Sequence, residues 1–534
     1  MTKQKESTLW LVLIALAALL RLGPIASGLP YIDYVDEGHI LHPAIGILKS
    51  RSFDSSIYTY PPLTSYLVVA AIKGYSTFYR MVHQRELRDD LPSDQDLKTA
   101  LGDHYDLIAP PEVIWLGRLV IACLSIGTVI LAGALAKLLG GSRPGLLAML
   151  FAALCPALVS RGSNLALDPT GTFFAIATLY FCQRLRIAAA VANNPAISRN
   201  AACAAISSGL AFGGKFTAGA VFVAVLATIL TIPVAWKSRA ILLVIAVAGL
   251  FAGVFCGVPA AVLHPEKIVG ELRYIASFYQ TIQSEHGYWR AAFSASEIGV
   301  PLMIAGLAGI IWMLWNASTR YVAVSWIAFA LLLLSGFVSS SFRPFRNLLP
   351  LVPLVCIAAA LFCVWSGGYL KVQLHRRTVA ALSFVAALTL LIALSLAWSS
   401  GRHLQWRTQR TDTRVRAIDW LQQHAAKDET VLGIRELSIL PAEWKRIAAQ
   451  PTVVPWFEAA ELLERQRFDY VVTGEFDLRY SPDPDAWSAY RDRWNAKVAP
   501  LRVEMNFGQV VTPVVPYLWR TNDERILILK GDAQ

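Results

Sequence analysis

The sequence predicts an α-helical polytopic membrane protein of about 11 transmembrane helices that ends in a small α/β domain. Three observations support this fold class. The chain of 534 residues is 55% hydrophobic and only 16% charged, whereas soluble domains average about 25% charged residues. Apolar runs long enough to cross a membrane recur as far as Trp398. From Gly401 onward, short helical and strand patterns alternate instead.

The apolar runs are candidate membrane spans, because a crossing helix needs roughly 17–25 predominantly apolar residues. The first run follows a basic N-terminus and resembles a signal peptide, but Arg21 and the lack of a small-residue cleavage pattern favour a retained helix. The fifth run is too short to cross straight, so it either breaks at Gly213-Gly214 or takes in flanking residues. The eleven runs are Thr8–Ile25, Trp115–Ala136, Pro144–Ser160, Pro169–Cys182, Ala201–Phe212, Phe216–Ala235, Ala240–Leu263, Ile298–Trp315, Tyr321–Phe337, Leu348–Trp365 and Thr378–Trp398.

Basic residues indicate how the spans are oriented. Lys and Arg fill the short loops at one end of successive spans, while the acids collect in longer loops at the other end. Because Lys and Arg favour the cytoplasmic side, this pattern puts the N-terminus in the cytoplasm and the C-terminal domain outside. The predicted location is the bacterial cytoplasmic membrane, with membrane lipids around the helices. The same loops account for the net charge of +11, and no basic stripe with interleaved aromatics predicts a nucleic-acid partner.

The chain is expected to divide into a polytopic transmembrane domain, residues 1–400, and an outer α/β domain, residues 401–534. The first outer loop, residues 29–112, contains an apolar-faced stretch, Leu63–Phe78, that suits a helix in the membrane interface. The outer α/β domain shows no Gly-rich phosphate loop and no catalytic constellation, so we expect it to support the membrane domain or to bind an acceptor. Its expected elements are helices Ala417–Ala426, Ala442–Ala449 and Phe457–Gln466 and strands Thr430–Ile434, Thr452–Val454 and Tyr470–Thr473.

Charged side chains collect at the predicted outer ends of four separate segments. A charge at the bilayer centre costs about 2.5–3.5 kcal/mol on insertion scales, so a cluster at the interface costs less and stays accessible to water. These residues are Asp36 and Glu37 after the first span, Asp168 between the third and fourth, Lys215 between the fifth and sixth, and Arg343 and Arg346 before the tenth.

This arrangement of acids and bases suits chemistry on a lipid carrier. Such a carrier buries its tail among helices and holds its phosphate at the interface, where Arg and Lys bind the phosphate and stabilise it as a leaving group. A carboxylate opposite takes the proton from an attacking hydroxyl. Transfer of a sugar from a polyprenyl-phosphate donor to a lipid, glycan or protein acceptor needs these groups.

Five sequence segments resemble, in the same order, segments of the C-type (GT-C) integral membrane glycosyltransferases. The closest resemblance is to the branch of protein O-mannosyltransferase-like and lipid A aminoarabinose transferase-like enzymes, and it covers roughly residues 5–400. No segment is specific alone, so the resemblance rests on their order and matching topology. The segments are YVDEGHILHPA, SFDSSIYTYPPLTSYLVVAA, SRGSNLALDPT, FGGKF and RPFRNLLPLVPLVCIAAAL.

The resemblance implies a GT-C-like fold and an inverting transferase that uses a polyprenyl-phosphate sugar donor. It implies that Asp36 is the general base, with Glu37 as its usual neighbour. It also implies that Asp168, which matches the second acid of an LDP-type motif, orients the site.

Two departures from the family pattern bear on the donor phosphate. Residues 346–350 match an Arg-Leu-Leu-Pro-like entrance, but Asn347 is inserted in it. Tyr60-Pro61-Pro62 stands where some aminoarabinose transferase-like members have a phosphate-binding Lys before the proline. This second departure argues against lipid A as the substrate and leaves Arg343, Arg346 or Lys215 to hold the phosphate.

Each candidate residue also has a simpler explanation. Asp36 and Glu37 suit a solvated loop or a helix cap, and Asp168 before a proline suits an N-cap. Lys215 and Arg346 suit side chains that reach for the interface.

A second outer segment contains the pair Glu285 and His286. The pair suits an acceptor-binding or metal-binding role, and it equally suits a structural one. The sequence identifies no cofactor with certainty, leaves a divalent cation open, and does not name a metal.

Two other classes of protein compete with a transferase. A transporter or lipid flippase would place broken helices and charges near the midplane and show internal repeats, whereas no repeat is visible here and the charges lie outside. A non-catalytic assembly protein, scaffolded by its C-terminal domain, would tolerate changes at all the candidate residues.

Overall fold

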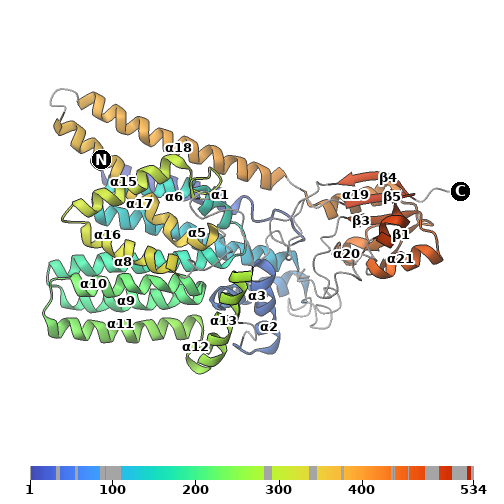
Figure 1. Ribbon diagram of the computed structural model, residues 1–534, viewed down its shortest axis with the longest axis horizontal. Helices are drawn as coiled ribbons and strands as arrows, with labels where there is room; N and C mark the ends of the chain where they lie inside the picture. Colours follow the sequence, from blue (N-terminus) through green and yellow to red (C-terminus); the bar gives the residue numbers. More distant parts are fainter. Residues whose placement is uncertain are drawn as a thin grey trace. The chain divides into compact units, whose positions relative to one another are not determined.

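The computed structural model describes residues 2–31, 36–54, 58–84, 91, 110–281, 292–335, 345–373, 378–409, 411–434, 437, 439, 441–454, 456–474, 492–507 and 526–530. The chain forms two compact units (Figure 1). We call Met1–Ile25, Ile40–Gln84 and Trp115–Thr408 the membrane unit, and Ala26–His39, Arg85–Ile114 and Gln409–Gln534 the tail unit.

Helices coincide with all eleven expected spans, which confirms the helical polytopic fold class. Among the described residues, five helices are long and apolar enough to cross a membrane by length and composition. The helices, with η for 3-10 helices, are α1 (Lys3–Leu22), α2 (Asp36–Ser50), α3 (Leu63–His83), α5 (Pro111–Gly140), α6 (Ser142–Leu154), α7 (Pro156–Arg161), α8 (Leu167–Ala190), α9 (Asn194–Gly214), η2 (Phe216–Val221), α10 (Phe222–Thr231), α11 (Trp236–Gly257), α12 (Ala260–Leu263), α13 (Pro265–Thr281), α15 (Val300–Trp315), α16 (Arg320–Ser335), η3 (Phe345–Leu351), α17 (Val352–Gln373) and α18 (Thr378–Gln409).

Helices α8, α9 and α11 lie side by side in the membrane unit (Figure 1). Helix α9 contains the short fifth apolar run and extends beyond it into the flanking residues. The side chain of Asn193 caps the start of α9 by accepting a hydrogen bond from the backbone N–H of Ala196 at 3.2 Å. Small residues let α9 and α11 touch by their backbones. A Cβ atom on Gly253 would lie 2.2 Å from the carbonyl oxygen of Ile206, so this crossing requires glycine.

The third expected span is interrupted inside the membrane unit. Helix α6 ends at Leu154, and α7 begins at Pro156, which has no N–H to continue the hydrogen-bond ladder. The fully buried Arg21 side chain donates hydrogen bonds of 3.1 Å to the carbonyl oxygens of Ala152 and Ala153. Arg21 therefore satisfies carbonyl groups that the interruption leaves without a helical partner.

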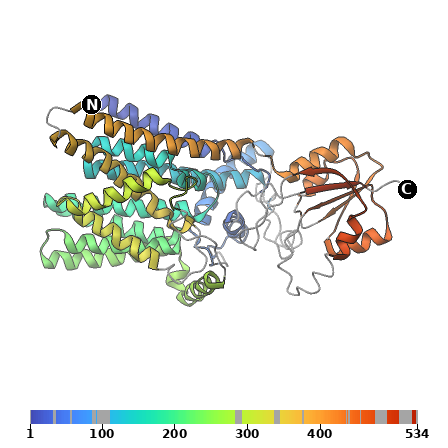
Figure 2. The same ribbon diagram turned by 45° about the horizontal axis from the view of Figure 1, so that its top comes forward.

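The C-terminal part of the tail unit is a small α/β domain, as expected. Its five strands lie in the order β2-β1-β3-β5-β4; β1 pairs in parallel with β2 and β3, and β5 pairs antiparallel with β3 and β4. Figure 2 shows this sheet with helices packed on it. The elements are α19 (Thr413–His424), β1 (Thr430–Ile434), α20 (Pro441–Trp444), β2 (Gln450–Val454), α21 (Trp456–Arg465), β3 (Tyr470–Gly474), β4 (Arg502–Phe507) and β5 (Ile526–Lys530).

Two details of this domain differ from expectation. The helix expected over Ala442–Ala449 ends at Trp444. A turn follows, in which the backbone N–H of Arg446 donates to the carbonyl oxygen of Glu443 at 2.9 Å, and β2 then starts at Gln450. Strands β4 and β5 were not expected. Their pairing with each other and with β3 turns a parallel three-stranded core into a mixed sheet.

Candidate functional site

The membrane unit brings Asp168 and Lys215 together. The ammonium group of Lys215 forms an ion pair with Oδ1 of Asp168 and donates a second hydrogen bond, of 3.0 Å, to Oδ1 of Asn347. The side chains of Lys215 and Asp168 are 14% and 3% exposed, and Asn347 is 1% exposed. Asp168 and Lys215, two of the predicted site residues, thus form one buried cluster with Asn347. The sequence prediction had treated Asn347 only as an insertion.

Glycines bring the ends of α8 and α9 close enough for this contact. Lys215 is the residue directly after α9, in extended backbone conformation. A Cβ atom on Gly171 would lie 2.9 Å from the Cβ of Lys215, and one on Gly214 would lie 2.7 Å from the backbone nitrogen of Gly171. The two helix ends therefore meet backbone to backbone, and the Lys215 side chain starts beside the turn that carries Asp168.

Asp168 lies in the first turn of α8 but does not cap it. The N-cap is Ala166, and no side chain caps the helix, so the simple N-cap explanation of Asp168 is wrong. A carboxylate in the first turn is favoured by the helix dipole, and Lys215 supplies the charge that a buried acid needs. The hydroxyl of Thr172 donates to the Asp168 carbonyl oxygen at 2.7 Å and further fixes this turn.

The start of α3 contacts the same turn of α8. The buried Thr64 hydroxyl donates a 3.0 Å hydrogen bond to Oγ1 of Thr170. Thr64 belongs to the TYPPLTSY segment, so two of the sequence segments that carried the family resemblance lie together in the membrane unit. Ser65, the next residue, donates to the carbonyl oxygen of Ile40 in α2 at 2.9 Å.

Helix η3 carries both Arg346 and Asn347. Arg346 is half-buried and Asn347 is buried. Sequence reasoning missed Asn347, although one signal was present: it is an amide directly before the apolar run LLPLVP. Polar side chains at such positions in membrane helices rarely lack a partner. Arg343, Glu285 and His286 lie outside the described residues.

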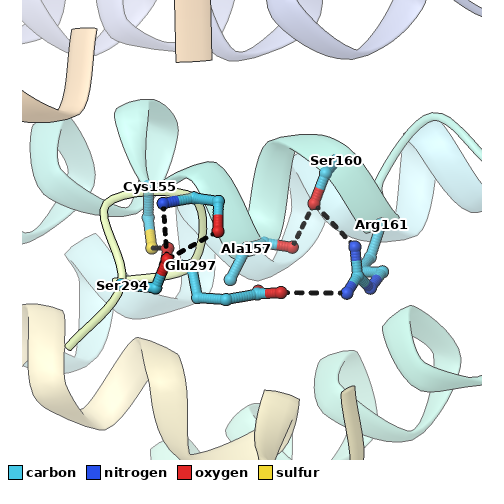
Figure 3. Close-up of polar contacts among 7 residues, drawn as sticks. Cys155, Ala157, Ser160, Arg161, Ser294 and Glu297 are labelled. Carbon is cyan, nitrogen blue, oxygen red and sulfur yellow. Dashed lines mark hydrogen bonds and ion pairs between the residues drawn. The ribbon is translucent and has the colours of Figure 1, made fainter. Parts of the chain in front are cut away.

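A second ion pair, which is partly buried, holds the segment that leads into α8 (Figure 3). Nη2 of Arg161 lies 3.1 Å from Oε1 of Glu297, in the loop before α15. The Glu297 carbonyl oxygen accepts from the backbone N–H of Ala157 at 2.9 Å, so the loop also binds the start of α7. Burial raises the pKa of Glu297, and the nearby Arg161 partly opposes this rise.

Arg407 of α18 anchors the same segment from another side. Its buried guanidinium donates to Oγ of Ser163 at 3.2 Å and to Oδ1 of Asn164. Residues 160–164 therefore have fixed contacts with the loop before α15 and with α18. These contacts fix the chain just before Asp168.

Asp36 and Glu37 occupy the first turn of α2, in the tail unit. They are 2% and 0% exposed, so the solvated-loop explanation is wrong for both. Acids are almost never fully buried unless they are paired, and the helix dipole favours carboxylates in a first turn.

No group of three or more His, Cys, Asp and Glu side chains among the described residues is arranged to hold a metal ion.

Comparison with solved structures identifies the fold. ArnT from Cupriavidus metallidurans in the apo state matches with a TM-score of 0.50 and 14% sequence identity, over 98% of this chain and 98% of that chain. The same protein bound to undecaprenyl phosphate matches with a TM-score of 0.50 and 14% identity, over 97% and 98%. The archaeal oligosaccharyltransferase AglB from Archaeoglobus fulgidus, in complex with an inhibitory peptide and a dolichol-phosphate, matches with a TM-score of 0.50 and 12% identity, over 95% and 73%.

No protein-family model matches the chain, and no curated protein matches its sequence. The structural matches show that the chain has the GT-C membrane fold, which confirms the fold that the five sequence segments implied.

Proposed function

We propose that this protein is an inverting glycosyltransferase that moves a sugar from a polyprenyl-phosphate donor to an acceptor hydroxyl at the outer face of the cytoplasmic membrane. The observation that carries the proposal is the buried cluster of Asp168, Lys215 and Asn347, where three helix ends of a GT-C fold meet. A buried ammonium group held by a carboxylate and an amide is preorganised for a phosphate oxygen, because the ammonium group is already in place and does not have to be reoriented during the reaction.

Each charged residue has a role in the proposed displacement. The acceptor oxygen attacks the anomeric carbon, the bond from that carbon to the phosphate oxygen breaks, and its electron pair stays on the phosphate. Lys215, with Arg346, stabilises the departing phosphate. Asp36 takes the hydroxyl proton, Glu37 supports Asp36, and Asp168 orients Lys215. A single displacement of this kind inverts the anomeric centre.

The donor class is supported by two of the matching structures, in which ArnT is bound to undecaprenyl phosphate and AglB is in complex with a dolichol-phosphate. The acceptor is a lipid, a glycan or a protein. The Lys and Arg distribution of the sequence supports a cytoplasmic N-terminus, and the tail unit then lies outside the cytoplasm.

The proposal is tested by comparing glycolipids, polysaccharides and proteins of cells that contain or lack the chain by mass spectrometry. We expect one class of molecule to lose a single sugar. Purified Asp36→Asn protein in proteoliposomes should still bind the donor lipid and should lose transfer. Full transfer by Asp36→Asn would contradict the role of the base, and net lipid movement without transfer would indicate a flippase instead.

A further inference from the structure

We propose that Arg186, near the end of α8 that is distant from Asp168, binds the phosphate group of an anionic phospholipid in the membrane leaflet at that end. The site lies within the membrane unit, where α10 contacts both α8 and α16 (Figure 1). It uses none of the cluster formed by Asp168, Lys215 and Asn347, and it does not depend on the proposed transfer reaction.

Arg186 lies at the level of a membrane interface. It follows Asp168 by 18 positions in α8, which corresponds to about 27 Å along a helix with a rise of 1.5 Å per residue. The hydrocarbon core of a bilayer is about 30 Å thick, so the two residues mark opposite interfaces. Trp236, Trp315 and Tyr321 are exposed at the end of the bundle that carries Arg186, as is typical of aromatic residues at headgroup level.

One nitrogen atom joins the Arg186 guanidinium to α10 and α16. Nη2 donates to the hydroxyl oxygens of Thr228 and Ser325, at 3.5 and 3.3 Å, and to the carbonyl oxygen of Tyr321 at 3.4 Å. The two hydroxyls donate their own hydrogens elsewhere, Thr228 to the carbonyl oxygen of Ala224 and Ser325 to that of Tyr321, each at 2.7 Å. All three acceptors of Nη2 are therefore neutral oxygens, and their bonds to the guanidinium are long.

No carboxylate neutralises this half-buried guanidinium. Within the part of the chain that the structure describes, Arg186 forms no ion pair, and all its hydrogen bonds come from Nη2. The sequence contains no Asp or Glu between Asp168 and Glu266, the stretch that includes α10. It contains none between Glu297 and Asp412, the stretch that includes α16. Because a charge drawn partly out of water needs an opposite charge, the missing anion has to come from outside these helices.

A second guanidinium lies beside the first. Arg320 directly precedes Tyr321, whose carbonyl oxygen binds Arg186, and the Arg320 guanidinium carbon lies 5.3 Å from the centroid of the Tyr321 ring. Arginine suits phosphate oxygens because its N–H donors lie in a planar fork. Arg186 thus offers a phosphate its free edge of Nη1 and Nε, and Arg320 adds positive charge at the surface.

Apolar side chains around these cations favour a lipid over a free anion. Ile187, Leu230 and Val324 are exposed, and each belongs to a different one of α8, α10 and α16. In a membrane, acyl chains cover such a surface while the headgroup stays at the interface. A headgroup with net negative charge is favoured, because a zwitterionic one brings its own cation toward two arginines.

The test measures lipid binding to the full chain in detergent by native mass spectrometry. We expect the wild type to bind phosphatidylglycerol about tenfold more tightly than phosphatidylcholine. Arg186→Met should weaken phosphatidylglycerol binding about tenfold more than Arg184→Met does, because only Arg186 contacts the phosphate directly. Arg184 is the matched control, since it carries the same charge on the same helix but is exposed and contacts Tyr180 instead.

Equal weakening by the two variants would overturn the proposal, because it would show only a general attraction between charges. A wild type without preference for phosphatidylglycerol would also overturn it. Thermal protection by inorganic phosphate alone that equals the protection by phosphatidylglycerol would assign the site to a free anion and contradict a lipid. If Arg186→Met unfolds at a lower temperature without lipid, Arg186→Gln decides: its amide still donates to Thr228 and Ser325, and it should lose lipid binding because the charge is gone.

Discussion

Lys215 and Asp168 form a buried ion pair although 47 positions separate them in the sequence. The pair joins the end of α9 to the first turn of α8, and Asn347 adds a neutral acceptor from η3. Because the two side chains bind each other, their roles have to be considered together. The sequence offered Lys215 as a phosphate ligand and Asp168 as a separate acid, whereas the structure makes the position of each depend on the other.

Removing one partner of this pair should therefore be more harmful than removing both charges. Lys215→Met leaves the Asp168 carboxylate buried without its cation, and breaking a buried pair costs about 3–5 kcal/mol. The double variant Asp168→Asn with Lys215→Met should recover a large part of that stability but not the transfer activity. Thermal unfolding of the detergent-solubilised variants measures the first effect, and donor-lipid turnover measures the second. Additive losses of stability in the double variant would show that the two side chains do not interact.

The glycine contact between α9 and α11 should be required for the same site, because Lys215 directly follows the last residue of α9. Gly253→Val places a Cβ against the Ile206 carbonyl oxygen, where the ideal distance is 2.2 Å, and forces the helices apart at a cost of about 1–3 kcal/mol. We expect a lower unfolding temperature and reduced turnover. Gly270→Ala in α13 is the matched control, since no atom lies within 4 Å of the added Cβ. Wild-type stability of Gly253→Val would contradict the packing described here.

Asp469 should give the tail unit a pH-dependent contribution to stability. Its carboxylate accepts from the backbone N–H of Thr430 at 2.7 Å and from the Thr430 hydroxyl at 2.9 Å. The backbone bond, followed by the hydroxyl bond, lowers the pKa of Asp469 below its ordinary 3.8. A lowered native pKa means that the stabilisation is present above pH 3.8 and is lost as the pH falls through the native value.

The variant Asp469→Asn should therefore destabilise β1 and β3 at neutral pH, and its difference from the wild type should shrink as the pH falls below about 4. Hydrogen exchange of peptides from β1 and β3 in the full chain measures this difference. A gap that stays constant from pH 7 to pH 3 would show that the carboxylate charge has no part in it. Asp428→Asn, which changes a nearby acid in the turn before β1, serves as the control.

The sequence was sufficient for features that depend on local pattern. Apolar runs identified the helices, and acids and bases at their ends identified Asp168 and Lys215, because the energetic cost of burying charge in a membrane makes such residues stand out. Contacts between distant segments could not be obtained in this way. Nothing near Asn347 indicates that its partner is Lys215, 132 positions away, and the close approach at Gly171 depends on how α8 and α9 pack.

In the tail unit too, local sequence patterns predicted individual strands but not the contacts between distant segments. Strands β1 and β3 are short β-branched runs and were predicted to within a residue. Strand β5, with the sequence ILILK, carried a similar signal that was not used. The cation–π contact between Arg414 and Tyr31, 3.8 Å from the guanidinium carbon to the ring centroid, had no sequence signal. It depends on the orientation that Asp412, the N-cap of α19, gives to the guanidinium.

The discontinuous make-up of the tail unit has a consequence for biosynthesis. Residues 26–39 leave the ribosome about 370 residues before Gln409, the difference between positions 39 and 409. At about 5–20 residues per second, this delay is on the order of 20–70 seconds. During that time the segment with Asp36 and Glu37 has no C-terminal partner to complete its compact unit. Folding of this acidic segment therefore waits for the last part of translation. A prematurely terminated chain would be left with an incomplete tail unit.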